Sequence, residues 1–261
     1  MTFEIDQFRL DGKVAVVTGA GGRGNSIGRA YALGLGKAGA AVVVADIQVE
    51  GARSVCEEIV STGGRAIAVG VDISRPESVQ AMASAAAEAF GGVDILVNNA
   101  ALMAELGYLP AIDIPLEQWN RILEVNLTGA LICAQAVVPL MRRRGGGKII
   151  NQVSGGAFPA LSVYGVGKLA LVGLTTTLAR QLGREKINVN AIAPGNTMSD
   201  AGKLLTPDDS PFIKMLEATV AMRVRGQPDE LVGALLLLCS PAGDWITGQV
   251  LHVDGGWVLR P

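Results

Sequence analysis

Short runs of valine, isoleucine and alanine recur along the chain and alternate with longer segments of helical periodicity. The runs predict strands at 14–17, 41–44, 66–69, 95–97, 149–150 and 187–192. Their apolar residues are nearly continuous, which is typical of strands buried on both faces of a parallel sheet. The segments between them predict helices near 27–39, 50–62, 76–90, 117–142, 163–184 and 228–239. This alternation predicts an α/β fold, a doubly wound parallel sheet with right-handed crossovers and helices on both faces.

The alternation predicts a single domain over residues 1–261, because no linker, repeat or low-complexity segment interrupts it. Segment 197–225 breaks the rhythm: Gly202 and the polar run 207–211 precede an amphipathic piece at 212–220. Insertions of this length in a compact domain are commonly functional or disordered. The segment follows the sixth strand, and open α/β sheets bind ligands beyond such strand ends. We therefore expect a substrate lid, with a permanently packed surface helix as the alternative.

Bulk composition argues against several classes of function. The net charge is −2 with acids and bases interspersed, which predicts no nucleic-acid partner. The most hydrophobic run, 231–239, is about half of a membrane span, and the N-terminus lacks the pattern of a signal peptide, so we expect no membrane association. The three cysteines lie far apart and there is one histidine. This usage favours a reducing cytoplasm and predicts no metal site.

A glycine-rich loop, T-G-A-G-G-R-G-N-S-I-G over 18–28, joins the first strand to the first helix. Glycines in this position let backbone N–H groups approach a pyrophosphate, and the helix dipole favours its negative charge. Asp46 stands 18 residues after Gly28, at the end of the second strand. A carboxylate there accepts hydrogen bonds from the adenosine ribose and repels a 2′-phosphate. The arrangement predicts a Rossmann-like dinucleotide site that prefers NAD.

Tyr164 and Lys168 stand four residues apart, which puts the phenol and the ammonium on one face of a helix. A neighbouring cation favours the phenolate, so we expect Lys168 to lower the pKa of Tyr164 from about 10 towards neutrality. Ser154 lies ten residues earlier, just past a strand, where it can hydrogen-bond a substrate oxygen. Taken alone, the Tyr-x-x-x-Lys pattern also fits an ordinary pair on a surface helix.

Taken together, these motifs resemble those of the short-chain dehydrogenase/reductase family over essentially the whole chain. The matching pieces are the loop 18–28, Asp72-Ile73, Asn98-Asn99-Ala100, Asn126, Ser154, Tyr164, Lys168, Pro194-Gly195 and the tail segments 246–249 and 254–256. The resemblance implies an NAD(H)-dependent oxidoreductase that interconverts a hydrophobic secondary alcohol and its ketone.

The resemblance also implies roles for single residues. Tyr164 would be the general acid/base, and Ser154 would position the carbonyl or hydroxyl oxygen. Lys168 would bind the nicotinamide ribose and tune Tyr164, and Asn126 would hold a water in a proton relay. The residues expected to contact the cofactor are Gly19, Ser26, Ile27, Asp46, Asp72, Ile73, Asn98, Ala100, Tyr164, Lys168, Pro194, Gly195 and Thr197. Among these, Asp72 and Ile73 would border the adenine, and Pro194-Gly195 would line the nicotinamide side.

Three features depart from the family's pattern. The glycine loop is about three residues longer than usual, and Ser26 stands where a middle glycine is expected. Ala101 follows Asn98-Asn99-Ala100 in place of a glycine. The interval from Ser154 to Tyr164 is about three residues shorter than is common, which leaves Ser162 as a second candidate for the role of Ser154.

Other functions stay open at this point. An NADPH-dependent ketoacyl reductase is opposed by Asp46, although Arg23 in the glycine loop would suit it. A dinucleotide-binding sensor without turnover would not need Tyr, Lys, Ser and Asn together, and a purely structural oligomerisation protein has no feature in its favour. Apolar residues around the expected pocket are compatible with a cyclic alcohol, a steroid-like ketone or a 3-hydroxyacyl thioester. These residues are Phe158, Leu161, Met198, Leu204, Leu205 and Phe212.

Segments 117–142 and 163–184 carry more apolar and small residues than one core-facing stripe requires. Surplus apolar surface generally marks an interface, and closed symmetry is the usual outcome. We expect a homo-oligomer, specifically a homotetramer. The family resemblance points to the same two helices and adds the C-terminal strand at 249–253 as a second interface.

Overall fold

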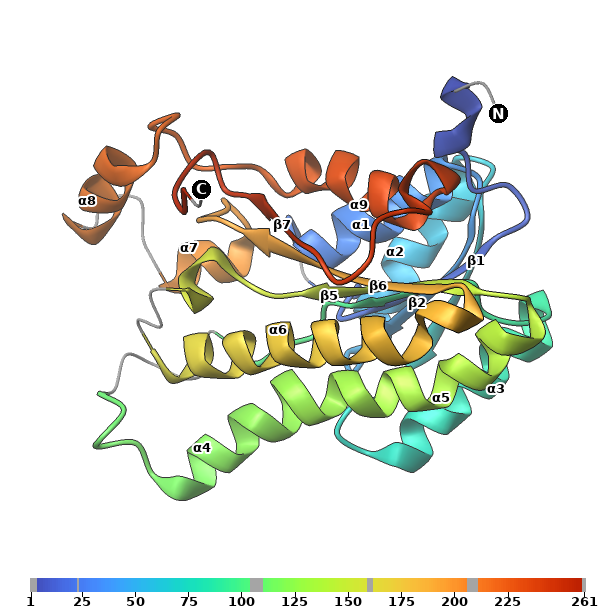
Figure 1. The fold of residues 1–261 in the computed structure, drawn as a ribbon, viewed down its shortest axis with the longest axis horizontal. Helices are drawn as coiled ribbons and strands as arrows, with labels where there is room; N and C mark the ends of the chain where they lie inside the picture. Colours follow the sequence, from blue (N-terminus) through green and yellow to red (C-terminus); the bar gives the residue numbers. More distant parts are fainter. Residues whose placement is uncertain (1–3, 23, 104–109, 159–161, 206–210, 260–261) are drawn as a thin grey trace.

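Seven parallel strands form one sheet in the order β3-β2-β1-β4-β5-β6-β7. The structure is a computed structural model that describes the chain except for residues 1–3, 23, 104–109, 159–161, 206–210 and 260–261 (Figure 1). The strands are β1 (Val14–Thr18), β2 (Ala41–Asp46), β3 (Arg65–Gly70), β4 (Ile95–Asn98), β5 (Gly147–Gln152), β6 (Ile187–Pro194) and β7 (Val250–Val253). The predicted doubly wound α/β sheet is confirmed, and each predicted strand lies within an observed one.

The strand order changes direction at β1, which pairs with β2 on one side and with β4 on the other. Val16, in the middle of β1, lies opposite Val43 of β2 and Leu96 of β4. In open α/β sheets such a switch leaves a crevice outside the carboxyl ends of the strands. The glycine-rich loop leaves β1 at this crevice.

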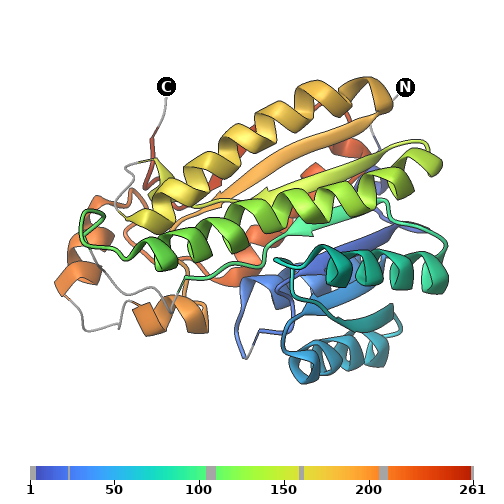
Figure 2. The same cartoon turned by 90° about the horizontal axis from the view of Figure 1, so that it is seen from below.

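One face of the sheet is covered by α3 (Pro76–Phe90), α5 (Gly129–Arg143) and α6 (Val163–Leu182). Figure 2, seen from below, shows these three helices side by side beneath the strands. Val137 and Met141 of α5 are fully buried on this side, where they pack in one apolar cluster with residues of α3 and the central strands. This layer of helices buries one face of the central strands, and a second layer buries the other, so both faces are apolar.

The opposite face is covered by α1 (Ile27–Lys37), α2 (Val49–Ser61) and α9 (Val232–Cys239) (Figure 1). Leu35 of α1 and Leu235 of α9 belong to a second apolar cluster with the residues of the central strands that point this way. The predicted helix near 228–239 begins as a 3-10 turn over Pro228–Leu231 and becomes an α-helix at Val232.

The predicted helix at 117–142 is interrupted. It consists of α4 (Leu116–Leu123), a π-helical turn over Glu124–Thr128, and α5. Among the described residues, Leu116–Arg143 is the one helical stretch long and apolar enough to span a membrane. Half of its most apolar part is buried inside the protein. A core helix of a soluble domain meets the same criterion.

Two short helices follow β6 beyond the carboxyl ends of the strands, α7 (Asp200–Leu205) and α8 (Pro211–Thr219). They occupy the segment predicted to form a lid, and α8 matches the amphipathic piece. The structure describes only some of the side chains in this segment. Residues 206–210 and the side chains of 205, 211, 212 and 216 are not among them. The remaining 3-10 turns are Ile5–Phe8, Gly155–Ala157, Gly183–Glu185 and Pro241–Gly243.

Candidate active site

A left-handed glycine turns the chain at the end of β1. Gly19 has φ +66°, and a Cβ there would lie 2.6 Å from the Cα of Ala100. In the first turn of α1, a Cβ on Gly28 would lie 2.1 Å from the carbonyl oxygen of Gly19. Neither position has room for a side chain, so the loop presents bare backbone at the start of a helix, as anion recognition requires.

The ends of β1 and β4 are joined by Asn99 and Thr18. The Asn99 amide nitrogen Nδ2 donates to the carbonyl oxygens of Thr18 at 2.9 Å and Gly19 at 3.0 Å. In return, the hydroxyl of Thr18 accepts from the backbone N–H of Asn99 at 3.1 Å and of Ala100 at 3.2 Å. The glycine loop is therefore fixed to the strand on the other side of the switch.

A cleft of about 460 Å³ opens beside this loop. Seven of the residues predicted to contact the cofactor line it, namely Gly19, Ser26, Ile27, Asp46, Asp72, Ile73 and Ala100. The segment after β6 contributes Ser199, Asp200, Ala201 and Leu204 to its lining. Ser26 also caps α1, because its hydroxyl accepts from the backbone N–H of Arg29 at 3.2 Å. The residue that replaces the usual glycine thus stabilises the helix start.

The side chain of Asn98 points away from the cleft. Its amide donates to Asn151 Oδ1 at 2.9 Å and to the carbonyl oxygen of Ala130 at 3.2 Å, so the side chain points into the protein between β4 and α5. Asn99 lines the cleft instead. Successive residues of an extended chain face opposite ways. The side chain of Asn98 therefore points inward, whereas Asn99, the next residue, faces the cleft.

Asp46 is the last residue of β2, and both of its carboxylate oxygens accept hydrogen bonds from backbone amides. Oδ2 accepts from Gly21 N–H at 2.8 Å, and Oδ1 accepts from Gln48 N–H at 2.9 Å. The first bond holds the glycine loop and the second holds the turn into α2. The carboxylate still lies in the cleft wall, so it combines a structural task with the position expected of a residue that recognises ribose.

Asp72 forms part of the cleft edge and organises the turn after β3. Its Oδ1 accepts from the hydroxyl of Ser74 at 2.6 Å and from its backbone N–H at 2.9 Å. The hydrogen bond from the Ser74 side chain is the main reason that the pKa of Asp72 falls below its ordinary value. Arg121 also lines the cleft and pairs with Glu124 at 2.7 Å. Sequence reasoning did not include this arginine.

Tyr164 and Lys168 lie on α6, with the Lys168 nitrogen Nζ 5.5 Å from the centre of the Tyr164 ring. Lys168 is 1% exposed, and its Nζ donates to the carbonyl oxygen of Gln152, the last residue of β5, at 2.7 Å. Gln152 lines the cleft. The hydrogen bond ties the helix that carries both residues to the strand end that leads into Ser154.

Burial shifts the pKa of both groups. It raises the pKa of Tyr164 above its ordinary value and lowers the pKa of Lys168 to about 7. The expectation that Lys168 lowers the pKa of the phenol is therefore wrong for this geometry: the ammonium lies over the ring, its own charge is weakened by burial, and removal from water dominates for the tyrosine.

Ser154 follows β5 in extended conformation and starts a 3-10 turn, and its hydroxyl accepts from Gly156 N–H at 3.1 Å. Ser162, the second candidate, is the N-cap of α6, where its hydroxyl accepts from Gly165 N–H at 3.3 Å. Each hydroxyl keeps its own proton for donation. Only Ser154 lies on the strand end that holds Lys168, so the site geometry favours the original assignment.

Asn126 lies in the π-helical turn and is 1% exposed. Its Oδ1 accepts from the backbone N–H of Leu102 at 2.7 Å, and its Nδ2 donates to the Leu102 carbonyl at 2.9 Å. Leu102 lines the cleft. The side chain thus fixes the chain that leaves β4.

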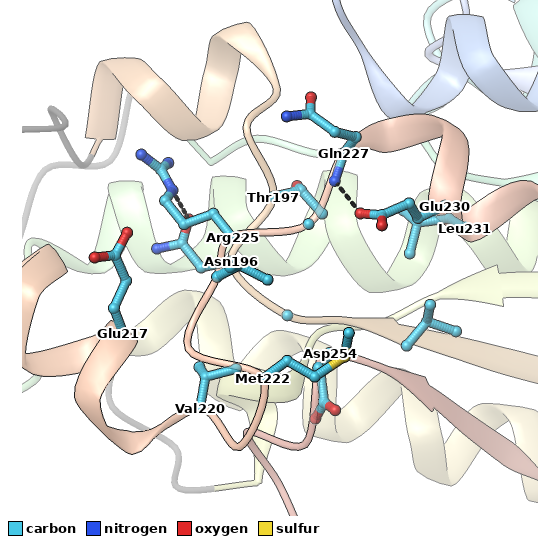
Figure 3. Close-up of a pocket in the computed structure, with 15 residues that line it drawn as sticks. Asn196, Thr197, Glu217, Val220, Met222, Arg225, Gln227, Glu230, Leu231 and Asp254 are labelled. Atoms are coloured by element: carbon cyan, nitrogen blue, oxygen red, sulfur yellow. Dashed lines mark hydrogen bonds between the residues drawn. The ribbon is translucent and has the colours of Figure 1, made fainter.

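Three predicted residues stand at the end of β6. Pro194 is the last residue of the strand, and Gly195 donates from its N–H to the carbonyl of Val253 at 3.1 Å. Gly195 and Thr197 line a second cavity of about 120 Å³, formed with the chain at 217–231 and 253–255 (Figure 3). In this view Arg225 points to Asn196, to whose Oδ1 it donates at 3.0 Å. Gly195 and Thr197 therefore line this smaller cavity, and the chain that continues from them lines the larger cleft at Ser199.

The apolar residues expected around the substrate are partly described. The rings of Phe158 and His252 lie 4.8 Å apart, next to the short turn that follows Ser154. Leu204 lines the cleft although 77% of it is exposed. Met198 receives a contact from Gln227 and is half-buried. Leu161 and the side chains of 205 and 212 lie outside the described residues.

These features fit a dinucleotide. Backbone that would collide with any Cβ at Gly19 and Gly28 leaves a cradle open to an anion, at the start of α1. Asp46 stands at the end of β2 on the same cleft. The fold and the cleft together define an α/β protein built to bind a dinucleotide at the switch point of its sheet.

Comparison with known proteins gives the family. The profile described as Enoyl-(Acyl carrier protein) reductase matches residues 22–258. An uncharacterized oxidoreductase of Mycobacterium tuberculosis is 44% identical over 251 residues, which cover 96% of this chain and 99% of that protein. The 7alpha-hydroxysteroid dehydrogenase of Escherichia coli is 40% identical over 260 residues and 98% of each chain.

A solved structure shows the same fold. The 7 alpha-hydroxysteroid dehydrogenase complexed with NADH and 7-oxo glycochenodeoxycholic acid superposes with a TM-score of 0.90 at 38% identity, over 99% of each chain. The chain belongs to the short-chain dehydrogenase/reductase family. It is an oxidoreductase of a family that uses nicotinamide dinucleotides.

The shifted pKa of Lys168 predicts a pH dependence of stability. In the unfolded chain the ammonium keeps its ordinary pKa of 10.5, whereas burial lowers that of the folded state to about 7. Between these values the unfolded state binds more protons, so the free energy of unfolding rises with pH. The charged lysine destabilises the fold fully below pH 7, and this effect is relieved towards pH 10.5.

We expect urea unfolding from pH 7 to 9.5 to show the wild type gaining stability relative to Lys168→Met. Over this pH range Tyr164 contributes little to the change in the free energy of unfolding. The raised pKa of its phenol affects stability only above the ordinary pKa of 10.0. Lys37→Met, at an exposed position of α1, is the control and should differ from the wild type by a constant amount. Parallel pH curves for the wild type and Lys168→Met would contradict the assignment.

Proposed function

We propose that this protein is an NAD(H)-dependent oxidoreductase that interconverts a hydrophobic secondary alcohol and its ketone, with Tyr164 as general acid/base. The observation that carries the proposal is the bond from Lys168 Nζ to the Gln152 carbonyl at 2.7 Å. It joins the helix of Tyr164 and Lys168 to the end of β5 that leads into Ser154, and Gln152 itself lines the cleft beside the glycine loop.

A bound nicotinamide ring supplies the hydride acceptor or donor in such a reaction. For ketone reduction, the protonated phenol of Tyr164 donates its proton to the carbonyl oxygen as negative charge develops there. The hydroxyl of Ser154 donates a hydrogen bond to the same oxygen, so two donors stabilise the charge. Lys168, anchored on Gln152, binds the ribose and supplies positive charge near the phenol. In alcohol oxidation Tyr164 takes the proton back.

NAD is the proposed cofactor because Asp46 stands in the cleft wall at the end of β2. A 2′-phosphate would approach a carboxylate that is already fixed by two backbone amides and cannot swing away. Like charges in contact cost several kcal/mol. In the cofactor site we assign Gly19, Ser26, Ile27, Asp72, Ile73 and Ala100 to contacts on the larger cleft, and Pro194, Gly195 and Thr197 to the nicotinamide side.

A ring-shaped or chain-like hydrophobic substrate is favoured by Leu204, which lines the cleft, and by Met198, which directly precedes the cleft residue Ser199. The relatives include a 7alpha-hydroxysteroid dehydrogenase, which adds weight to a steroid-like alcohol among the candidates. Reduction of an acyl substrate with NADPH is the second candidate, favoured by the profile described as Enoyl-(Acyl carrier protein) reductase. A screen of cyclic, steroid-like and acyl-thioester substrates with each cofactor separates the two.

Tyr164→Phe should lower kcat by about 10²–10⁴-fold, since a positioned acid/base contributes that much, while the affinity for NADH stays within about twofold of the wild type. Lys168→Ala should lose both activity and NADH affinity, because it has two tasks. Initial rates and NADH fluorescence titration measure the two effects. A Tyr164→Phe variant that kept more than a tenth of wild-type kcat would refute the acid/base role.

For Asp46 we expect kcat/KM with NAD to exceed that with NADP at least tenfold, about 1.4 kcal/mol, and Asp46→Ala to relax this ratio. The substitution also removes the bonds to Gly21 and Gln48, so the absolute rate should fall with both cofactors. The ratio is therefore the informative quantity. A wild type that used both cofactors equally would overturn the proposed preference.

We further propose a homotetramer in which α5 and α6 form one interface and β7, the edge strand of the sheet, forms another. Val166 and Leu169 of α6 are 38% and 43% exposed in the single chain, as residues of an interface would be. Light scattering at micromolar concentration should give about four times the chain mass of 27.0 kDa. Leu169→Asp should shift the protein to smaller species, with Ser54→Asp, at an exposed position of α2 on the opposite face of the sheet, as a control. A stable wild-type monomer would exclude this assembly.

A further inference from the structure

The lengthened glycine loop is bonded to the segment that follows β6. The backbone N–H of Asn25 donates to Asp200 Oδ2 at 3.0 Å, and the N–H of Asp200 donates to the Asn25 carbonyl at 2.9 Å. The side-chain amide of Asn25 adds a bond to the carbonyl of Met198 at 3.1 Å. Three hydrogen bonds therefore join two parts of the chain that are 175 residues apart.

The residue before Asn25 fits this contact closely. Gly24 has φ +60°, and a Cβ at this position would lie 2.1 Å from Asp200 Oδ2. Its left-handed conformation turns the loop towards Asp200, and its missing side chain leaves room for the carboxylate. Gly24 and Asn25 lie in the loop 18–28, which is about three residues longer than the family's usual pattern.

The other end of the segment is fixed independently. Thr197 pairs with Gly226 in an isolated parallel bridge, and Met198 donates to the Gly226 carbonyl at 2.8 Å. Ser199 caps α7 by accepting from Gly202 N–H at 3.1 Å. The first turn of α7 is thus held at its base by the chain at 226, and Asp200 in this turn is bonded to the glycine loop.

The neighbours of the bonded residues line the cleft, and so does Asp200 itself. Gly22 and Ser26, on either side of the extended part of the loop, line the cleft from one side. Ser199, Asp200 and Ala201 line it from the other. A dinucleotide whose pyrophosphate lies on the glycine loop would therefore be enclosed between the two, and its release would need them to part.

We propose that Asn25 and Asp200 form a clasp that closes the chain after β6 over the bound dinucleotide and sets its dissociation rate. The proposal rests on the function proposed above in that a nicotinamide dinucleotide occupies this cleft. Asp200 is a positioning residue here, acting through the loop. Lid opening and product release commonly limit turnover, so the clasp would also bear on kcat.

The sign of the effect distinguishes a clasp from simple electrostatics. Asp200 carries a negative charge on a cleft that receives a pyrophosphate, so removal of the carboxylate lessens repulsion and by itself would slow dissociation. Loss of the clasp would instead speed dissociation. The two interpretations predict opposite changes for the same variant.

The test is stopped-flow displacement of NADH, followed by its fluorescence. Asp200→Ala and Gly24→Ala should each raise the dissociation rate about tenfold, which is the loss of a charge-assisted hydrogen bond expressed as a rate ratio. Asp200→Asn keeps an oxygen that accepts from Asn25 and should release NADH no faster than the wild type. Lys203→Ala, exposed on the same helix, is the matched control and should leave the rate unchanged.

The double variant Gly24→Ala/Asp200→Ala decides whether both changes act on one contact. Because both break the same clasp, its rate should equal that of the single variants, whereas independent effects would multiply. Equal or slower release in Asp200→Ala and Gly24→Ala, or multiplied effects, would overturn the clasp. If Asp200→Ala fails to fold, the comparison of the NADH dissociation rates of Gly24→Ala and Asp200→Asn decides between the two interpretations. A wild type that binds neither NADH nor NADPH would refute the proposed function and the clasp together.

Discussion

The hydrogen bonds between Asn99 and Thr18 hold the switch point of the sheet, and the site depends on them. A parallel sheet diverges where its strand order changes direction, and nothing in the ladder itself connects the loops that leave β1 and β4. Asn99 makes this connection by donating to the carbonyls of Thr18 and Gly19. The glycine loop, Ala100 and Leu102 then take their positions from one anchored point, and Leu102 in turn is clamped by Asn126.

This connection constrains which residues the loop can use. With Gly19 against Ala100, a Cβ at Gly28 would meet both the Gly19 carbonyl and the amide of Asn99. On the far side, Asp46 reaches back to Gly21. The loop is therefore fixed at its start, its middle and its end before any ligand is considered. Preorganised donors of this kind lose little freedom on binding, which favours affinity for an anion.

Periodicity was enough to predict the strands, since the buried central strands carry apolar residues on both faces. It missed the π-helical turn at Glu124–Thr128 because the extra residue per turn leaves the apolar pattern of 117–142 almost unchanged. The motif Asn98-Asn99-Ala100 located the cleft edge, but which asparagine faces it depends on the strand register. Arg121 carried no sequence signal, because its contribution arises only when α4 packs beside the loop after β3.

The lysine of the Tyr-x-x-x-Lys pair shows the limit of reasoning from residue types. Spacing alone implies a cation that acidifies the phenol, but burial acts on both groups and makes each charge costly. Burial lowers the pKa of Lys168 to about 7, and the carbonyl of Gln152 offers the ammonium only a partial negative charge in place of a full counter-ion. A carboxylate in the same place would keep the ammonium charged and would bind it tightly. The carbonyl of Gln152 occupies one of the three N–H donors of the ammonium.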